Sequence, residues 1–501
     1  MSPALHKVAW TCVASAALAS CAVPAVGPNY KRPDVVVPAS WRVDAGEAAA
    51  ATNARWWQGL GDADLDGLVG EALAANADLL IAAARVDEFA AKLEGERSHY
   101  FPQVGYDASF KRDQRSKEVP ELLQPGQPPT FNQYGFGGTV GYEFDFWGRM
   151  RRANEAARAE LLSSQEARHT VMLTVVANVA SSYVELLELD NELAMAQQQL
   201  ASLRDSLALT QQKFAGGSAT DLDVARARAD LAEQAAVIPE LERAIATLEN
   251  GLSTLVGRNP GRIQRGSIDK LKLIAVPQGV PSDVLTRRPD VMAAEAALRA
   301  ANARIGVAKG EYFPKFALTG YLGQSSDLVR WLLAKTATAG LLDLDLAGPI
   351  LSFGKVQGTV REARAVTRQE EQRYLQAVRN AVAEVDNALV FNAKATEHLT
   401  AVGEQLAARR QVASLSQARF EGGSGTNLDV LNAQRGVYEA RVLQGQGMRD
   451  QYLALIAVYK ALGGGWMVAE DSKAVAQSSA VGSPIAASAK FPTTTHDADA
   501  Q

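Results

Sequence analysis

The chain has 501 residues, of which 47% are hydrophobic and 7% aromatic, and its formal net charge is −5. This length and apolar content exclude a largely disordered protein. The acidic balance gives no broad basic field of the kind that nucleic-acid binders carry, so we expect no nucleic-acid partner.

The N-terminal residues have the layout of an export signal. The segment HKVAWTCVASAALASC joins a weakly basic start to an apolar stretch and ends in LASC at Cys21. Small residues before a cysteine resemble a bacterial lipobox, so we predict a lipoprotein signal peptide at 1–20 and lipidation of Cys21, for example with palmitate. The alternative is an ordinary signal peptide that happens to contain a cysteine. Because Cys12 lies in the removed segment, we expect no internal disulfide.

The residues after the signal predict an extended tether and then a pair of repeats. Residues 21–62 are proline-spaced at their start, as in AVPAVGPNYKRPDVVVPASW, and are expected to lead away from the lipid. No later uninterrupted apolar run approaches the roughly 18–20 residues of a membrane helix. If the protein spans a membrane, we expect it to do so with strands.

The first predicted repeat covers residues 63–256. Its expected elements are a helix at 63–99, strands at about 101–112 and 133–147, a long helix at 149–214, a tip turn at 215–220 and a helix at 221–256. Hydrophobic residues recur every seven positions along the long helix, which predicts a supercoiled helix of about 100 Å. The members of this series are Met172, Val179, Leu186, Leu193, Leu200, Leu207 and Phe214.

The second predicted repeat covers residues 283–462 and follows a linker at 257–282. Its expected elements are a helix at 283–310, strands at about 312–323 and 338–350, a long helix at 355–420, a tip turn at 421–426 and a helix at 427–462. The segment KFAGGSATDLDV at 213–224 returns as RFEGGSGTNLDV at 419–430, and a YFP segment precedes the strands of both repeats. Residues 463–501 are expected to contain a disordered, Ala/Ser/Thr-rich tail.

The strands alternate between apolar residues and small or polar ones. Tyr134, Phe136, Val140, Tyr142 and Phe144 alternate with glycines, Thr139 and Glu143. This pattern fits either a half-buried soluble sheet or the wall of an outer-membrane barrel. Four strands cannot close a barrel, and an open edge in lipid would leave backbone groups unpaired. If the strands lie in the membrane, several chains must therefore share one barrel.

Each tip turn has the residues that end one helix and start the next. Gly216, Gly217, Gly422 and Gly423 suit the left-handed backbone of a helix C-terminus. Thr220 and Thr426 suit the N-cap position, with Asp223 and Asp429 three residues later as in a capping box. On this interpretation the aspartates merely start helices.

The sequence contains no pattern of an enzyme or a metal centre. The five histidines are scattered, and there is neither an HExxH segment, a nucleophile elbow nor a phosphate loop. We therefore predict no catalytic residues, no metal and no cofactor, and energy for any transport must come from a partner.

Several separate motifs together resemble the outer-membrane factor family, the TolC/OprM/NodT type of efflux-channel lipoprotein. They are the lipobox, VGPNYKRPD, VPSDVLTRRPDVMAAEAAL at 280–298, the paired YFP segments and the doubled GGS-x-T-x-LDV turns. The resemblance implies a mainly α protein with a membrane β-barrel. A homotrimer would form 12 strands on a long α-helical barrel, with an equatorial domain built from the chain ends and the linker.

The resemblance also implies a location, partners and a function. The protein would be a lipid-anchored component of the outer membrane with a long periplasmic portion. It would dock on a periplasmic adaptor, or membrane fusion protein, and an inner-membrane pump of the RND type. It would passively export small molecules, as in multidrug resistance. The duct of a type I protein secretion system is the alternative within transport, and a non-channel periplasmic coiled-coil scaffold is the alternative outside it.

Threefold symmetry would turn each tip aspartate into a ring of three carboxylates. Asp429 matches the gating aspartate of the family, whereas the family's second aspartate falls on Asn432. The inner carboxylate ring would therefore be weaker, or Asp223 or Asp221 would supply its charge. Arg226 is a further gate candidate, either pairing with an acid across the tip or lying exposed on its helix. The tips Gly216, Gly217, Ser218, Thr220 and Gly422, Gly423, Ser424, Thr426 are candidates for adaptor contact.

Overall fold

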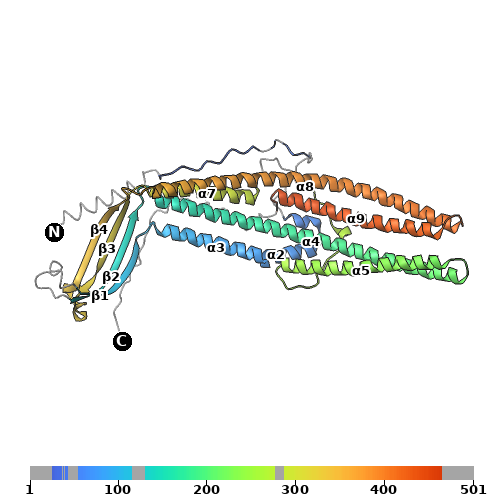
Figure 1. The fold of residues 1–501 in the computed structure, drawn as a ribbon, viewed down its shortest axis with the longest axis horizontal. Coiled ribbons are helices and arrows are strands. Elements are labelled where there is room, and N and C mark those ends of the chain that lie inside the picture. The colour runs from blue at the N-terminus through green and yellow to red at the C-terminus, as the bar shows by residue number, and fades with distance from the viewer. Residues whose placement is uncertain are drawn as a thin grey trace, which may run out of the picture.

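The computed structural model describes residues 25–36, 38, 40–42, 55–114, 130–276 and 287–464. A four-stranded sheet lies at one end of an elongated molecule, and two helical hairpins end at the opposite end (Figure 1). Cys21, the loop at 115–129, the segment 277–286 and the tail from 465 onward lie outside the described residues. The prediction for Cys21 therefore stays a prediction.

The two repeats contain the same order of elements, except that two helices precede the strands in the first repeat and one in the second. The first consists of α2 (Ala63–Ala75), α3 (Ala77–Ser98), β1 (Gln103–Gln114), β2 (Thr130–Phe144), α4 (Arg149–Ala215) and α5 (Asp221–Leu255). The second consists of α7 (Pro289–Gly310), β3 (Lys315–Ser326), β4 (Thr338–Ala347), α8 (Lys355–Glu421) and α9 (Asn427–Ala461). Short 3-10 turns include η1 (Trp56–Leu60) and η3 (Ile268–Lys270).

The stretch expected as one helix at 63–99 is divided at Asn76. The Asn76 side chain accepts a hydrogen bond from the amide of Leu79 at 3.0 Å and so caps α3. The same side chain donates to the carbonyl of Leu255 at the end of α5, at 2.7 Å. Asn76 therefore starts a new helix and joins it to the first hairpin.

The four strands form one antiparallel sheet in the order β1-β2-β3-β4. The register pairs Val104 with Val140, Val140 with Gly320 and Gly320 with Leu342 across the sheet. Because side chains alternate along each strand, these partners share one face with the other apolar residues. The opposite face carries small and polar residues, such as Thr139 paired with Gly105 and Tyr321.

The apolar face of the sheet is exposed within the protomer. Val104 is 81% exposed, Tyr106 84% and Leu342 75%. An apolar surface of this extent marks an interaction or membrane surface in a protein that is otherwise well packed. Among the residues that the structure describes, the outer strands β1 and β4 each pair with one strand, so both edges of the described sheet are open.

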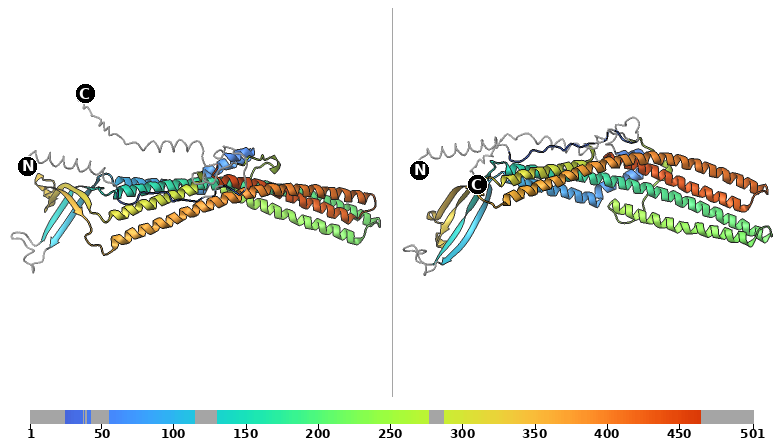
Figure 2. Two further views of the ribbon diagram at one scale, coloured as in Figure 1. Left: turned by 90° about the horizontal axis from the view of Figure 1, so that it is seen from above. Right: turned by 45° about the horizontal axis from the view of Figure 1, so that its top comes forward.

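The long helices pack through their heptad positions. Each of α4 and α8 has 67 residues, which at ~1.5 Å per residue corresponds to about 100 Å. Two buried clusters hold them, one around α4 with α2 and the end of α9, and one between α7, α8 and α9. The heptad residues Val179, Leu186, Val378 and Val385 lie in these clusters. Figure 2 shows α4 with α5, and α8 with α9, running to tips at the same end.

Two helical stretches, residues 63–98 and 149–215, each contain an 18-residue window apolar enough to cross a membrane by composition. In the second stretch 56% of that window is buried inside the protomer, and in the first 22%. Composition of this kind is shared by the packed helices of soluble assemblies.

The N-terminal tether is fastened at several points along the helices. The amide of Val26 donates to the carbonyl of Trp147 at 3.0 Å, at the junction of sheet and helices. Further along, Arg32 Nε donates to Glu295 of α7 at 3.0 Å, and the hydroxyl of Tyr30 donates to the same carboxylate at 3.1 Å. These bonds hold the tether against α7.

Candidate functional site

The first hairpin tip is built by a glycine stop and a capping box. After α4 ends, Gly217 adopts a φ of 75°, a left-handed conformation that favours glycine. Thr220 then caps α5, since its backbone amide donates to Asp223 Oδ2 at 2.9 Å and the Asp223 amide donates to Thr220 Oγ1 at 3.2 Å. The capping predicted from the sequence is confirmed here.

The second tip has nearly the same geometry. Gly423 has a φ of 74°. The Thr426 amide donates to Asp429 Oδ2 at 3.0 Å, and the Asp429 amide donates to Thr426 Oγ1 at 3.2 Å. The same capping prediction is confirmed, and the two tips are structural copies of one another.

The tip carboxylates are held in their charged form. The hydroxyls of Thr220 and Thr426 each donate to the capping aspartate at 2.7 Å. These side-chain bonds, followed by the backbone bonds to the same threonines, lower the pKa of Asp223 and of Asp429 below the ordinary value of 3.8. Because these bonds favour the charged form and the pKa values lie below 3.8, each tip presents an ionised carboxylate at neutral pH.

The tips differ in their remaining charges. Asp221 and Arg226 of the first tip are exposed, and their counterparts in the second tip are Asn427 and Asn432. Arg226 forms no ion pair among the residues that the structure describes, although its charge contributes to the lowered pKa of Asp223. The structure thus places Arg226 exposed on its helix, and brings it together with none of the other gate candidates except Asp223.

The two tips touch each other through one side-chain pair. The Lys213 ammonium at the end of α4 lies over the Phe420 ring at the end of α8, 4.5 Å from its centroid. Farther from the tips, Arg435 of α9 pairs with Glu233 of α5 at 2.8 Å, and Gln234 Nε2 donates to the Tyr438 hydroxyl at 3.3 Å. The hairpins of one protomer are therefore joined along their length.

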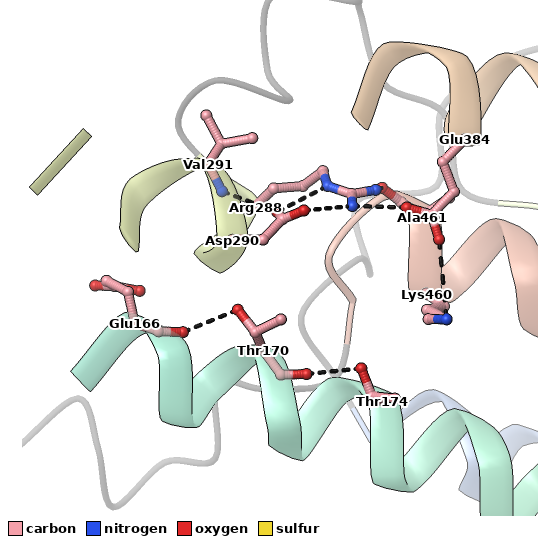
Figure 3. A network of polar contacts seen from close by, with 9 residues as sticks. All are labelled: Glu166, Thr170, Thr174, Arg288, Asp290, Val291, Glu384, Lys460 and Ala461. Carbon is pink, nitrogen blue, oxygen red and sulfur yellow. Dashed lines mark hydrogen bonds and ion pairs between the residues drawn. The ribbon is translucent and has the colours of Figure 1, made fainter. Parts of the chain in front are cut away.

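A charge network centred on one buried arginine joins the start of α7, the middle of α8 and the end of α9. We call it the Arg288 hub; it consists of Arg288, Asp290, Glu384, Lys460 and the carbonyl of Ala461 (Figure 3). Arg288 Nη1 donates to the Ala461 carbonyl at 2.7 Å, and Nη2 donates to Asp290 at 2.7 Å and to Glu384 at 2.6 Å. Burial lowers the pKa of Arg288, but the bonds to Asp290 and Glu384 outweigh it and raise that pKa overall.

The hub gives the RRPD segment a structural role that the sequence did not reveal. Arg288 is the N-cap residue of α7, and its side chain bonds the last carbonyl of α9 and a glutamate of α8. Three helices that are far apart in sequence thus meet at one guanidinium. Figure 3 also shows α4 beside the hub, where Thr170 and Thr174 donate to carbonyls one turn earlier in their own helix.

A buried glutamate was also missed by the sequence analysis. The side chain of Glu188 on α4 is 2% exposed and faces Arg449 of α9 at 3.9 Å. Its Oε1 has no hydrogen-bond partner within the described part of the chain. Burial, and next the charge of Glu192, raise the pKa of Glu188 to about 7. No heptad or motif marks this position, so only its burial identifies it.

Over the described ranges, no group of three or more His, Cys, Asp or Glu side chains is arranged to hold a metal ion. What the site presents is therefore charge, in the form of carboxylates at the tips of long hairpins. Such an arrangement can attract cations and can pair with basic groups of another chain.

Comparisons with known proteins show which family has this architecture. The model of a family described as outer membrane efflux protein matches residues 68–258 and 280–464, one segment for each repeat. The chain is 30% identical over 440 residues to the pyoverdine export outer membrane protein OpmQ of Pseudomonas putida, covering 86% of this chain and 93% of that protein. It is 29% identical over 478 residues to the cation efflux system protein CusC of Escherichia coli, covering 93% and 100%.

The fold matches solved channels as well. The outer-membrane channel OprN superposes with a TM-score of 0.79 at 29% identity, covering 88% of this chain and 99% of that one. These matches confirm the fold class expected from the sequence. It is a mainly α fold of two repeats whose strands enter a membrane β-barrel completed by a homotrimer.

Proposed function

The chain belongs to the outer membrane efflux protein family, and from this premise we propose that it is the exit duct of a tripartite efflux system. Members of this family are outer-membrane channels, and this chain is one of them. In the proposed system, small molecules are delivered by an inner-membrane pump and a periplasmic adaptor and leave passively through the trimer.

The observation that carries the proposal is the open four-stranded sheet on ~100 Å helices. Its apolar face is exposed, and within the described part of the chain β1 and β4 each lack a second partner strand. Three copies supply 12 strands and pair every edge, which is the condition for strands to lie in lipid. The helices then extend away from the membrane by a length suited to crossing a periplasm.

The cargo and partners follow from the relatives and from the chemistry of the chain. OpmQ is named for pyoverdine export and CusC for cation efflux, and both cargoes are small. We propose small-molecule cargo here too. Since the sequence has no phosphate loop, the energy must come from the pump, for which we propose the RND type on the strength of the family resemblance.

The proposed assembly includes a lipid anchor at Cys21. The tether that follows this residue is fastened to the junction of sheet and helices, which supports an anchor on the same side as the barrel. A Cys21→Ala variant should still require detergent for extraction from membranes, because the barrel remains embedded. A freely soluble Cys21→Ala variant would contradict the channel and favour a scaffold held by lipid alone.

For the tips we propose that Asp429 forms the principal ring of the periplasmic gate, supported by Asp223 and Asp221 of the first tip. Its lowered pKa keeps three charges at the ring at neutral pH. The same carboxylate caps α9, so charge and cap must be separated by experiment. The tips themselves, with Gly422 and Ser424 as an example, are the proposed adaptor contacts.

Ion conductance in a planar bilayer tests both levels of this proposal. The purified wild-type trimer should conduct with a preference for cations, and a protein that conducts no current would contradict the duct itself. Asp429→Asn should lower the cation-to-anion permeability ratio by removing three charges. Thr426→Ala is the matched control, because it breaks the cap and keeps the charge. If both variants alter selectivity equally, the cap rather than the charge ring controls the gate.

A further inference from the structure

The side-chain contact between the two tips of a protomer has an equivalent pair of residues elsewhere in the same tips. Lys213 lies over Phe420, and both side chains are half-buried. The repeat places Arg419 where Lys213 lies, and Phe420 where Phe214 lies, each 206 residues later (419 minus 213). Arg419 and Phe214 are the remaining cation and the remaining ring.

This second pair is left open within the protomer. Phe214 is 47% exposed, and Arg419 is also exposed. Within the described residues, the Arg419 side chain donates to the carbonyl of Ser424 in its own turn, at 3.4 Å, and its charge helps to lower the pKa of Asp429. The backbone around both pairs is equivalent, since α4 and α8 end one residue before Gly216 and Gly422. The difference in burial therefore reflects which neighbour is present, and not a difference in local fold.

A ring of two-repeat chains supplies the missing neighbour. Three copies around one axis present six hairpins in the order first, second, first, second. The step from a first to a second hairpin occurs inside a chain, and the step from a second to a first hairpin occurs between chains. Where the repeats are equivalent, the same side chains meet at both steps.

We propose that Arg419 of each copy packs its guanidinium on the Phe214 ring of the neighbouring copy, so that cation–aromatic contacts close the ring of six tips. This inference rests on the trimer of the proposed function. Arginine is suited to the position, because its planar group stacks on aromatic faces better than an ammonium does. The occupant of the exposed Phe214 ring is thus a second copy of this chain.

The other bonds between the hairpins do not recur at the proposed seam. The Glu233–Arg435 pair would become Glu439 beside Ala229, and the Gln234–Tyr438 pair would become Ala440 beside Ala232. Polar bonds therefore join the hairpins inside a copy, whereas the tip contact is the one that the repeat reproduces between copies. The proposed interface between copies is therefore held at the tips and lacks these polar bonds farther along the hairpins.

Cysteine crosslinking with a short bismaleimide tests the contact in the full-length trimer, because a cation on a ring can leave the two Cα atoms beyond the ~7 Å that a disulfide spans. A chain carrying Phe214→Cys and Arg419→Cys should form covalent dimers and trimers with this reagent, seen on a denaturing gel and absent without it. The matched pair Lys213→Cys with Phe420→Cys should react within the chain and migrate as a monomer. Co-expression of the two single variants should stop at covalent dimers, because each chain then has one reactive position.

The outcomes separate this inference from the proposed function. A trimeric 214/419 double variant that stays monomeric on the gel, while the 213/420 pair reacts, overturns the contact; an adaptor would then be the occupant of Phe214. If the double variant does not assemble, the co-expressed single variants decide in the same way. Wild-type protein whose mass in detergent is that of a monomer would overturn the proposed trimeric duct instead.

Discussion

The Arg288 hub and the hairpin tips place charge in opposite surroundings. At the hub, a buried guanidinium bonds two carboxylates and a helix-terminal carbonyl. At the tips, Asp223 and Asp429 are exposed and bond the first turn of their own helices. Removing a partner from a buried charge is far more costly than removing an exposed one.

This difference separates residues that hold the fold from residues that are available for function. The hub bonds tie α7, α8 and α9 together, so its substitution should be felt in stability. The tip charges contribute little beyond their caps, so they can serve conduction and contacts with other chains.

Arg288→Ala should have the largest effect. It removes the cation shared by Asp290 and Glu384 and the donor to the Ala461 carbonyl. Because both carboxylates are part-exposed and Glu384 keeps Lys460 at 3.9 Å, we expect the free energy of unfolding to fall by about 2 kcal/mol. Urea unfolding of the detergent-solubilised protein, followed by far-UV circular dichroism, measures it. Arg243→Ala is the control, because Arg243 pairs with Glu240 on an exposed surface and should change stability by at most about 0.5 kcal/mol. Equal losses in the two variants would show that the hub contributes no more to stability than an exposed ion pair does.

Thr220→Ala and Thr426→Ala should have intermediate and equal effects. Each removes one cap, worth about 1 kcal/mol, and the two boxes have matching bond lengths. Hydrogen exchange at the first turns of α5 and α9 should accelerate by about fivefold in the corresponding variant. Thr247→Ala, in the interior of α5, should leave both turns protected. Unequal losses at the two tips would show that their local stability depends on more than the shared cap.

Acidification should have the smallest effect and should act on the tips. The pKa values of Asp223 and Asp429 are lowered in the fold, so their capping contribution is fully present above the ordinary value of 3.8. It is lost as the pH falls through the lower folded pKa. Hydrogen exchange at 221–224 and 427–430, corrected for intrinsic rates, should rise below that pH. Asp429→Asn should remove the pH response at the second tip only; a response that persists there would assign it to another group.

The elements that the sequence predicted well are those with local causes. Glycine pairs stop α4 and α8, and threonine with aspartate three residues later starts α5 and α9. The strand alternation gave the two faces of the sheet, because the pleat fixes which side chains share a face. Heptads gave the long helices, because packing of one face requires that period.

The features that escaped prediction depend on contacts between distant segments. The break at Asn76 needs the carbonyl of Leu255, and the hub needs α8 and α9 beside the start of α7. The Glu188 carboxylate is buried only because α9 covers it. No local pattern encodes these partners, so the role of Arg288 could be read only from the folded chain.

The attachment of Val26 limits the distance between Cys21 and the junction of sheet and helices. Five peptide steps separate Cys21 from Val26 (26 minus 21), and an extended chain covers at most about 3.6 Å per residue. Acyl chains on Cys21 would therefore enter the bilayer within about 18 Å of Val26, where the strands meet the helices. With Cys21 lipidated, the tether would limit how far this junction can lie from the inner surface of the outer membrane, and a longer spacer would remove that limit.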